Sequence, residues 1–228
     1  MHISPYHAQW HAHSMPEHQM DHDNSYPVRL VDGSTLVLPL RPLPGGEKAI
    51  ALLMSNQTGF AVERVLIRLL TDMVRELKPE VIVGVPTMGL AYARPVAENL
   101  GFDDYVALGH SRKFWYDSAL SQCLTSSTSP DQAKHLYLDP ALVERVRGRR
   151  VVIMDDVLNT GRTAAAAIRL MQKVQARVAG VAAVLTEGWA WRTELEHTGP
   201  DMPGLVHALG HIPMFGRTEA GWRPLADT

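Results

Sequence analysis

Two adjacent carboxylates, Asp155 and Asp156, come at the end of a short apolar run and just before a turn rich in threonine. The turn is Asn-Thr-Gly-Arg-Thr, residues 159–163. Backbone N–H groups in such a turn, with the positive end of a following helix, suit a phosphate group, and the threonine hydroxyls add donors. Because carboxylates repel phosphate, we expect the two acids to face neutral hydroxyl groups, as on a ribose. The stretch therefore predicts a site that binds phosphate at one end and sugar hydroxyls at the other.

The elements around this stretch place it at the edge of a sheet. The four apolar residues at 151–154 are typical of a buried parallel strand, and the alanine-rich run after Thr163 is typical of a helix. In open α/β folds, ligands bind at the carboxyl ends of the strands. A strand that ends in acids and enters a helix through such a turn therefore predicts a ligand site at that edge.

The same stretch resembles the phosphoribosyl-pyrophosphate (PRPP) motif of the type I phosphoribosyltransferases. Both show an apolar run, Asp-Asp, two apolar residues and X-Thr-Gly-X-Thr, here over residues 151–163, although many relatives carry a second glycine where Arg162 stands. An ordinary strand–turn–helix with a solvated acidic pair is the alternative, but strand, acids, turn and helix all agree in order and spacing. The resemblance implies catalytic and PRPP-binding roles for Asp155 and Asp156. It implies PRPP binding by Asn159, Thr160, Gly161, Arg162 and Thr163.

A second turn lies between an expected strand at 80–86 and an expected helix at 90–100. In the family that the motif resembles, this turn is the pyrophosphate loop, where backbone amides meet the leaving group. The resemblance therefore implies PRPP binding by Pro86, Thr87, Met88 and Gly89. Proline and glycine suit a close approach of backbone to ligand, and the helix adds its positive end. Many relatives carry a basic residue near Met88, so here the backbone would act with less side-chain help; a plain turn is the alternative.

Two adjacent cations, Arg112 and Lys113, open a polar, Ser/Thr-rich stretch at 109–135. A loop of this length inside a compact domain is usually functional or mobile. On a mobile loop the cations could close over pyrophosphate, neutralise it as the C–O bond breaks and exclude water. Adenine, xanthine and orotate phosphoribosyltransferases carry an Arg-Lys pair at the corresponding place, so the resemblance implies a catalytic role for both. The alternative is an ordinary solvated pair.

The residues that would contact an acceptor base are the least determined part of the predicted site. An expected strand at 178–185 leads to Glu187 and Trp189, at the sheet edge where a base could stack. Trp189 would offer a flat aromatic wall and Glu187 one hydrogen-bond acceptor. This combination suits a purine better than orotate, whose carboxylate would favour an extra cation in the pocket. Phe215 and Trp222 are rival walls, and tryptophans near a sheet edge are more often packing than ligand contacts.

Strands that alternate with helices predict an α/β fold with a mainly parallel sheet flanked by helices, as in the type I phosphoribosyltransferase core. Helices are expected over 62–77, 90–100 and 164–175, and a further strand over 105–108. A hairpin signal around Asp32-Gly33 and the C-terminal segment lie outside this unit, and in the family such flanks form a small hood that selects the base. The sequence thus predicts one domain over 26–228, with a core at about 59–186 and a hood from 26–58 and 187–228.

Residues 1–25 form a compositional island that holds six of the chain's eleven histidines. A metal site is one interpretation, but the spacing is irregular and no cysteine accompanies the histidines, whereas a built site needs fixed ligand geometry. We therefore expect a mobile tail with adventitious metal affinity, which can be deleted without loss of activity.

Composition narrows the possible partners and compartments. The net charge of −2 over 228 residues gives no electrostatic argument for nucleic acid or anionic membrane. No apolar stretch approaches the roughly 20 residues of a membrane span, and the start of the chain lacks the pattern of a secretion signal. Cys123 is the only cysteine, so no intrachain disulfide can form, and nothing near it suggests a nucleophile. These features predict a cytoplasmic protein.

The resemblance implies an enzyme that transfers ribose 5-phosphate from PRPP to a ring nitrogen of a nucleobase, releasing pyrophosphate with Mg²⁺. The order of the loops and the Arg-Lys pair most resemble those of the adenine, xanthine and orotate enzymes. This resemblance also implies that the protein forms a homodimer. The alternatives are a PRPP- or nucleotide-sensing regulator with the same fold and a catalytically silent binding module. The mild net charge and the absence of a helix-turn-helix segment argue against the regulator, and the Arg112-Lys113 pair argues against the silent module.

Overall fold

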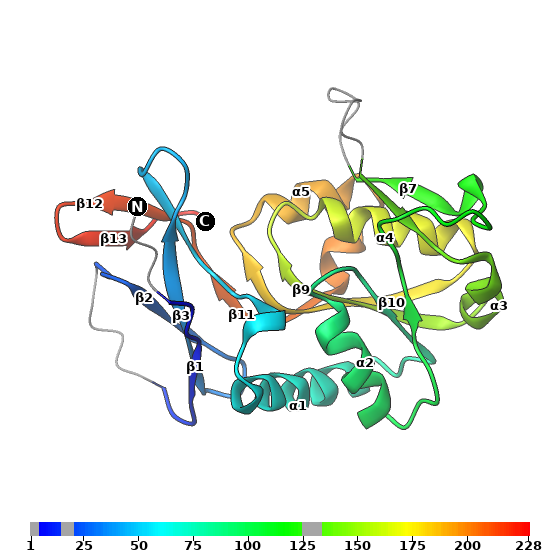
Figure 1. Ribbon diagram of the computed structural model, residues 1–228, viewed down its shortest axis with the longest axis horizontal. Helices are drawn as coiled ribbons and strands as arrows, with labels where there is room; N and C mark the ends of the chain where they lie inside the picture. Colours follow the sequence, from blue (N-terminus) through cyan, green and yellow to red (C-terminus); the bar gives the residue numbers. More distant parts are fainter. Residues whose placement is uncertain (1–4, 15–20, 125–133) are drawn as a thin grey trace.

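The computed structural model describes residues 5–14, 21–124 and 134–228. Over these residues the chain forms a five-stranded parallel sheet, here called the core sheet, and an antiparallel sheet beside it, here called the hood sheet (Figure 1). The predicted α/β fold with a mainly parallel sheet flanked by helices is confirmed. Among these residues, no helix is both long enough and apolar enough to cross a membrane.

The core sheet has the strand order β11-β10-β9-β5-β6, with all neighbours parallel. Its strands are β5 (Val81–Gly84), β6 (Val106–Ala107), β9 (Arg150–Leu158), β10 (Arg177–Glu187) and β11 (Val206–Ile212). From β5 the chain passes to β6 on one side, and β9 then lies on the other side of β5. Because the strand order reverses between β5 and β9, a ligand crevice is expected outside their carboxyl ends.

Helices cover both faces of the core sheet (Figure 1). They are α1 (Phe60–Glu76), α2 (Leu90–Asn99), α3 (Val143–Val146), α4 (Arg162–Lys173) and α5 (Ala190–Glu196). Side chains alternate along β9: Val152 and Met154 pack in the cluster that contains α1 and α2, whereas Val151 and Ile153 pack with α4. This burial on both faces explains why the motif strand is apolar from Val151 to Met154. The helices predicted at 62–77, 90–100 and 164–175 are confirmed.

The hood sheet combines segments from both ends of the chain. Its strands are β1 (Gln9–His11), β2 (Ser25–Arg29), β3 (Thr35–Pro42), β4 (Lys48–Ala51), β12 (Phe215–Thr218) and β13 (Gly221–Pro224). The predicted hairpin is β2–β3, and its turn contains Gly33 at a φ of 83°, a conformation that glycine adopts without strain. The Asp32 carboxylate accepts a hydrogen bond from the Ser34 backbone N–H at 3.0 Å and so closes the turn.

The N-terminal segment differs from the predicted mobile tail. Residues 9–11 pair with β3 as strand β1, and the Trp10 indole donates a hydrogen bond to the Ser34 hydroxyl at 2.9 Å. The Tyr6 hydroxyl lies 3.0 Å from the Thr58 hydroxyl, and Ala8 is buried. Aromatic and small residues between the histidines therefore fix this segment to the hood. This packing was not predicted from the sequence, where only the histidines were considered. His22 also bridges to Trp222 of the hood. Residues 1–4 and 15–20 of the predicted tail lie outside the described part of the chain.

The C-terminal segment is divided between the two sheets, whereas the sequence assigned all of 187–228 to the hood. Helix α5 and strand β11 complete the core, and only β12 and β13 join the hood. Strand β11 was missed because glycine and histidine dilute its apolar pattern, at His207, Gly210 and His211. The core thus extends 26 residues beyond its predicted end at 186, to Ile212.

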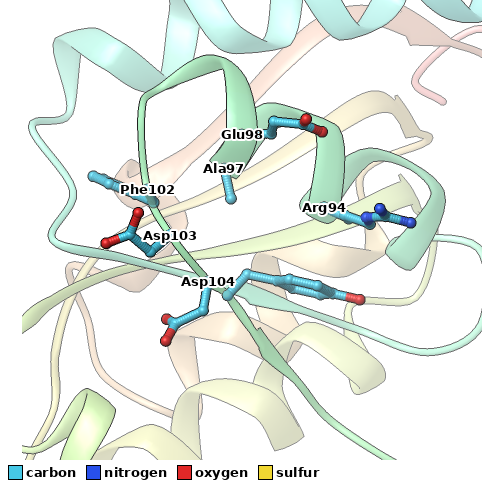
Figure 2. Close-up of a pocket in the computed structure, with 7 residues that line it drawn as sticks. Arg94, Ala97, Glu98, Phe102, Asp103 and Asp104 are labelled. Carbon is cyan, nitrogen blue, oxygen red and sulfur yellow. The ribbon is translucent and has the colours of Figure 1, made fainter.

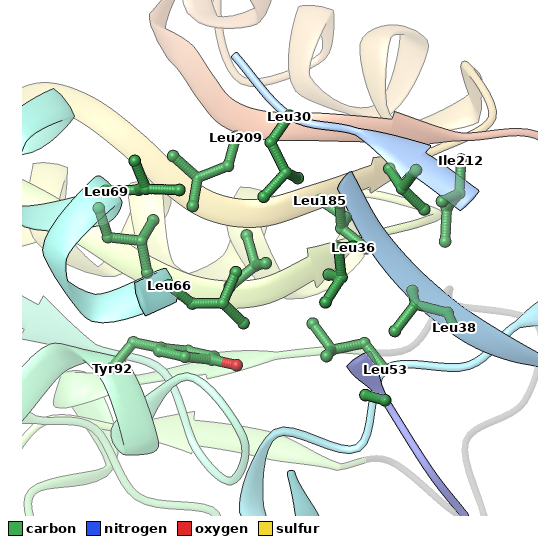
Figure 3. Close-up of a cluster of buried hydrophobic side chains, with 14 of the residues drawn as sticks. Leu30, Leu36, Leu38, Leu53, Leu66, Leu69, Tyr92, Leu185, Leu209 and Ile212 are labelled. Carbon is green, nitrogen blue, oxygen red and sulfur yellow. The ribbon is translucent and has the colours of Figure 1, made fainter. Parts of the chain in front are cut away.

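Hood and core share one hydrophobic cluster (Figure 3). Leu36 and Leu38 of β3 meet Leu66 of α1 and Leu185 of β10, and all four are fully buried. The Val31 backbone N–H also donates to the Leu209 carbonyl oxygen at 2.8 Å, so the tip of the hood hairpin is fixed to the edge of β11. The hood is therefore packed rigidly against the carboxyl end of the core sheet.

The polar stretch at 109–135 carries more structure than the sequence predicted. Strands β7 (Ser121–Cys123) and β8 (His135–Tyr137) form a small antiparallel hairpin beside α4. Short 3-10 turns η1 (Ser55–Gln57), η2 (Ser118–Leu120), η4 (Pro140–Leu142) and η5 (Met202–Leu205) complete the described elements. Residues 125–133, between the two strands, lie outside the described part of the chain.

Candidate active site

The predicted phosphate turn connects β9 to α4 and surrounds a small cavity. Asp155 and the turn residues Asn159, Thr160, Gly161 and Thr163 line this cavity of about 110 Å³. The structure therefore brings the first acid and four of the five predicted turn residues to one place, while Arg162 is exposed at the start of α4 and does not line it.

Gly161 is required where the turn enters the helix. Its φ of +76° is a left-handed conformation that L side chains rarely adopt, and a Cβ atom here would lie 2.8 Å from the Cα atom of Trp191. The turn can therefore pack directly against the backbone of α5. The Gly161 carbonyl oxygen accepts from the Ala165 backbone N–H at 2.8 Å and starts the helix.

The two acids share an unusual electrostatic environment. Burial raises the pKa of Asp155 well above its ordinary value, and the neighbouring Asp156 carboxylate raises it further. Burial also raises the pKa of Asp156. The Asp156 backbone N–H donates to Asp155 Oδ1 at 2.9 Å, which orients the Asp155 carboxyl group. Because a buried carboxylate and its half-buried neighbour resist ionising together, hydroxyl donors or a positive charge that develops beside them would stabilise the pair.

The predicted pyrophosphate turn lies beside the phosphate turn, because β5 and β9 are neighbours. The Val85 backbone N–H donates to the Met154 carbonyl oxygen at 2.9 Å, and the peptide bond between Pro86 and Thr87 is cis. A Cβ atom on Gly89 would lie 2.6 Å from that same carbonyl oxygen and 2.9 Å from the Cα atom of Asp155. Gly89 therefore lets the turn approach the acids closely.

The predicted cations lie on the loop after β6, which contacts the pyrophosphate turn through His110. The His110 imidazole Nε2 lies 3.1 Å from the Pro86 carbonyl oxygen, and its Nδ1 lies 3.4 Å from the His135 carbonyl oxygen. Arg112 and Lys113 follow and are both exposed. Sequence reasoning missed His110, whose only signal was its position two residues before the Arg-Lys pair.

Trp189 faces an open cavity of about 560 Å³ between α5, β11 and the tip of the hood hairpin. The His211 imidazole stacks on the Trp189 ring, with 4.2 Å between ring centres, and the Arg192 guanidinium lies 4.4 Å from the ring centre. His211 Nδ1 in turn lies 2.9 Å from the Thr186 hydroxyl. The predicted stacking wall thus already has protein partners. Arg192 is the nearest cation in the exit segment, but its contact with the Trp189 ring and the stacking of His211 were not predicted. A stacking contact between Trp189 and a base stays a prediction.

The second predicted base contact, Glu187, lies elsewhere. Its side chain is only 5% exposed, and its Oε2 accepts a hydrogen bond from the Asn159 carboxamide of the phosphate turn. Burial raises the pKa of Glu187 to about 7. The rival walls Phe215 and Trp222 are buried within the hood sheet and pack there. Of the four side chains considered for the base, only Trp189 lines the open cavity.

A further cavity, of about 470 Å³, lies beside α2 and contains none of the predicted site residues (Figure 2). It is lined by charges of both signs, among them Arg94, Glu98 and Asp103. Its position at the connection from α2 to β6 places it at the amino end of the strands. The described geometry therefore concentrates the predicted chemistry at the opposite, carboxyl edge.

Comparison with known proteins identifies the family. A family model for the phosphoribosyl transferase domain matches residues 56–197, which is more than half of the chain. The chain belongs to the type I phosphoribosyltransferases. The predicted membership and enzyme class are thereby confirmed, and the matched region contains both turns, the Arg-Lys loop and Trp189.

Individual relatives include both enzymes and regulators. Adenine phosphoribosyltransferase of Frankia alni is 31% identical over 159 residues, covering 63% of this chain and 71% of the relative. The probable purine biosynthesis transcriptional regulator PurR of Streptococcus pneumoniae is 28% identical over 142 residues, covering 62% of this chain. The match spans half of that regulator's length.

Solved structures support the fold of this phosphoribosyltransferase. Adenine phosphoribosyltransferase from Thermoanaerobacter pseudethanolicus superposes with a TM-score of 0.56 at 21% identity, covering 67% of this chain and 82% of that one. The corresponding enzyme from Rhodothermus marinus gives 0.51 at 23% identity. At such identities the likeness concerns the fold alone.

Proposed function

We propose that this phosphoribosyltransferase transfers ribose 5-phosphate from PRPP to a ring nitrogen of a purine base and releases pyrophosphate. One observation carries the proposal: the phosphate turn and the pyrophosphate turn lie side by side at the strand-order reversal, with Asp155 between them. This arrangement offers anion-binding backbone at two separated points and carboxylates in the middle, as a ribose that carries a phosphate at each end requires.

In this arrangement each group has a defined task. The turn at 159–163 would bind the 5-phosphate, the acids at 155 and 156 would accept hydrogen bonds from the ribose hydroxyls, and residues 86–89 would bind the pyrophosphate. The bond from C1 of the ribose to the pyrophosphate oxygen breaks, the bond from C1 to the base nitrogen forms, and the ring N–H proton of the base is released. The buried carboxyl pair would stabilise the positive charge that develops on the ribose as the first bond breaks.

We propose that Mg²⁺ enters as part of the substrate, as Mg·PRPP. No group of three or more His, Cys, Asp or Glu side chains is placed to hold a metal ion within residues 5–14, 21–124 and 134–228. Magnesium commonly keeps several waters and is held through substrate phosphates rather than by a protein cage, so the residues present fit this form of substrate. When bound, the ion would neutralise charge on the leaving pyrophosphate.

The purine preference is the finer part of the proposal. It is supported by the exposed Trp189 at the open cavity, by that cavity's volume and by the similarity to adenine phosphoribosyltransferases. The test measures pyrophosphate release from Mg·PRPP over a panel of nucleobases. Adenine or a 6-oxopurine should give the highest release, whereas fastest turnover with orotate would contradict the purine assignment.

The same assay tests the wall of the base pocket. Trp189→Ala should raise the base KM far more than the PRPP KM, because it removes a flat apolar surface beside the base. Phe60→Ala, which truncates an aromatic residue that is 75% exposed on α1, is the matched control and should leave both constants unchanged. An unchanged base KM in Trp189→Ala would remove Trp189 from the pocket.

A regulator that binds PRPP without catalysis is the second candidate, and the similarity to PurR favours it. The two candidates differ in one readout. A regulator of this kind would bind Mg·PRPP yet release no pyrophosphate with any base in the panel, whereas the enzyme releases pyrophosphate in proportion to base turnover.

We also propose a homodimer in which the Arg-Lys loop reaches the partner's site. It is supported by the family resemblance and by the exposure of the loop, where Phe114 is 97% exposed. Mixing Lys113→Ala chains with Asp155→Asn chains should then restore part of the activity that each variant lacks. No recovery at any ratio, together with a monomer in sedimentation, would contradict the proposal. The cytoplasmic location stays a prediction.

A further inference from the structure

A buried carboxyl group behind the phosphate turn has no role in the chemistry described so far. Glu187 is the last residue of β10 and is 5% exposed. Its Oε2 accepts from the Asn159 carboxamide, but its Oε1 is fully buried and has no hydrogen-bond partner among the residues that the structure describes. A buried carboxylate oxygen without a donor is costly, so packing alone does not explain an acid at this position.

The position of Glu187 is well defined. The next residue, Gly188, donates its backbone N–H to the Ile212 carbonyl oxygen at 3.0 Å and accepts from the Trp191 indole at 3.1 Å. Asn159 lines the cavity of the phosphate turn, whereas Glu187 does not. Glu187 therefore stands behind Asn159 and is linked to the cavity by the hydrogen bond from that side chain.

The charged groups on neighbouring elements are engaged elsewhere. His211 of β11 pairs with the Thr186 hydroxyl, and Arg192 of α5 lies against the Trp189 ring. On β9, Asp155 and Asp156 carry the other carboxyl groups of this sheet edge, and Arg162 at the start of α4 is exposed. Burial and the hydrogen bond from Asn159 are the two causes that act on the pKa of Glu187, and burial dominates.

We propose that Glu187 is a positioning residue that holds the Asn159 carboxamide at the phosphate turn as a neutral acid, so that PRPP binding is coupled to proton uptake. The proposal rests on the proposed function, because it takes the cavity beside Asn159 as the site of the 5-phosphate.

Charge and hydrogen bonding both favour the neutral form when PRPP is bound. An ionised carboxylate one side chain behind a bound phosphate would repel it through a medium of low dielectric constant. A proton on Oε1, the oxygen that no donor faces, removes this repulsion and leaves Oε2 as a carbonyl oxygen that still accepts from Asn159. With a pKa of about 7 in the free protein, both forms of Glu187 are present near neutral pH. Binding PRPP then shifts the group toward the protonated form.

The experiment measures Mg·PRPP binding by calorimetry from pH 6 to pH 8.5, in pairs of buffers with different ionisation enthalpies. Glu187→Gln is permanently neutral and keeps an acceptor oxygen for Asn159. Wild-type affinity should weaken above about pH 7 by up to tenfold per pH unit relative to Glu187→Gln. Near pH 7.5 the wild type should take up a fraction of a proton more than the variant. Glu196→Gln, an exposed acid on α5, is the matched control and should follow the wild type.

Kinetic constants separate this role from a base contact. Glu187→Ala should raise the PRPP KM at least tenfold with little change in the base KM, and Glu187→Gln should restore the PRPP KM at low pH. A change confined to the base KM would overturn the proposal and return Glu187 to the base pocket. Equal pH dependence and equal proton uptake in wild type and Glu187→Gln would overturn it while leaving PRPP binding intact. If the wild type binds no Mg·PRPP at any pH, the proposed function itself fails.

Discussion

Asp155 combines the two properties that the proposed reaction asks of an acid. It is almost fully buried, and it shares its surroundings with a second carboxyl group. The sequence predicted both acids and their order, because an apolar run followed by Asp-Asp is a local pattern. It could not predict their raised pKa values, since burial depends on α2, α4 and β10 folding against β9.

Glu187 gives a stability prediction that needs no substrate. Its pKa of about 7 in the folded chain lies above the ordinary value of 4.5, so the folded chain binds more protons than the unfolded chain between those pH values. The free energy of unfolding therefore falls as pH rises through this window, by about 3 kcal/mol at most for this group. Between pH 5 and pH 8, urea unfolding should show the free energy of unfolding of Glu187→Gln rising relative to that of the wild type by up to that amount. A difference that does not change with pH would mean that Glu187 stays ionised in the folded protein.

The elements at the site were predicted unequally, for physical reasons. Strand β9, its turn and α4 could be predicted because each has a strong local pattern. These patterns are an apolar run, glycine with threonine, and an alanine-rich helix. Strand β11 could not be predicted from the sequence, because its edge position lets histidine and glycine replace apolar residues. The contacts of His110 and His211 join residues far apart in sequence, and no local pattern indicates such pairs.

The close approach of the two turns predicts a sharp requirement for glycine at position 89. In Gly89→Ala the new Cβ atom would lie 2.6 Å from the Met154 carbonyl oxygen, which is backbone and cannot rotate away. We expect a loss of about 1–3 kcal/mol in the free energy of unfolding and weaker Mg·PRPP binding. Gly204→Ala is the control, because a Cβ atom there meets nothing within 4 Å. Equal effects of the two substitutions in urea unfolding would contradict the close approach.

The loop that carries Arg112 and Lys113 should act on the reaction rather than on the fold. Lys113→Ala should lower turnover by roughly 10²- to 10³-fold, because it removes a cation from the charge that develops on pyrophosphate. The melting temperature should barely move, since exposed charges contribute little to stability. Lys48→Ala, an exposed lysine in the hood, should change neither quantity. Full turnover in Lys113→Ala would show that Arg112 and Lys113 are solvated surface residues without a role in the reaction.

Taken as one body, the protein is a parallel core whose open edge is covered by a sheet built from both chain ends (Figure 1). The shared cluster of Leu36, Leu66 and Leu185 ties hood to core, so the wall over the cavity at Trp189 is fixed in place (Figure 3). The sequence predicted that a hood exists, but not that residues 9–11 belong to it. The packing of Tyr6 and Trp10 could not be predicted locally, because their hydrogen-bond partners are more than twenty residues away in sequence.

The pairing of β1 with the hood predicts that the N-terminal segment contributes to stability, while the expectation that activity survives its deletion stays a prediction. Deleting residues 1–24 removes β1, the Trp10–Ser34 and Tyr6–Thr58 hydrogen bonds and the apolar contacts of both aromatic rings. The melting temperature should fall by about 5–10 °C. Trp10→Ala alone should reproduce part of the fall, whereas His11→Ala, an exposed neighbour on the same strand, should not. Unchanged melting in the deletion would show that β1 contributes nothing to the hood.

The central claim is that the turn at 159–163 and the acids before it bind PRPP, and calorimetry with Mg·PRPP in the absence of any base tests it most directly. The wild type should bind, and Asp155→Asn, Asp156→Asn and Thr160→Ala should each weaken binding. For Thr160→Ala, loss of a hydrogen bond to a charged group corresponds to about 10- to 150-fold in Kd. Asp72→Asn, an exposed acid on α1, should bind as the wild type does. Unchanged affinity in all three site variants would contradict the account.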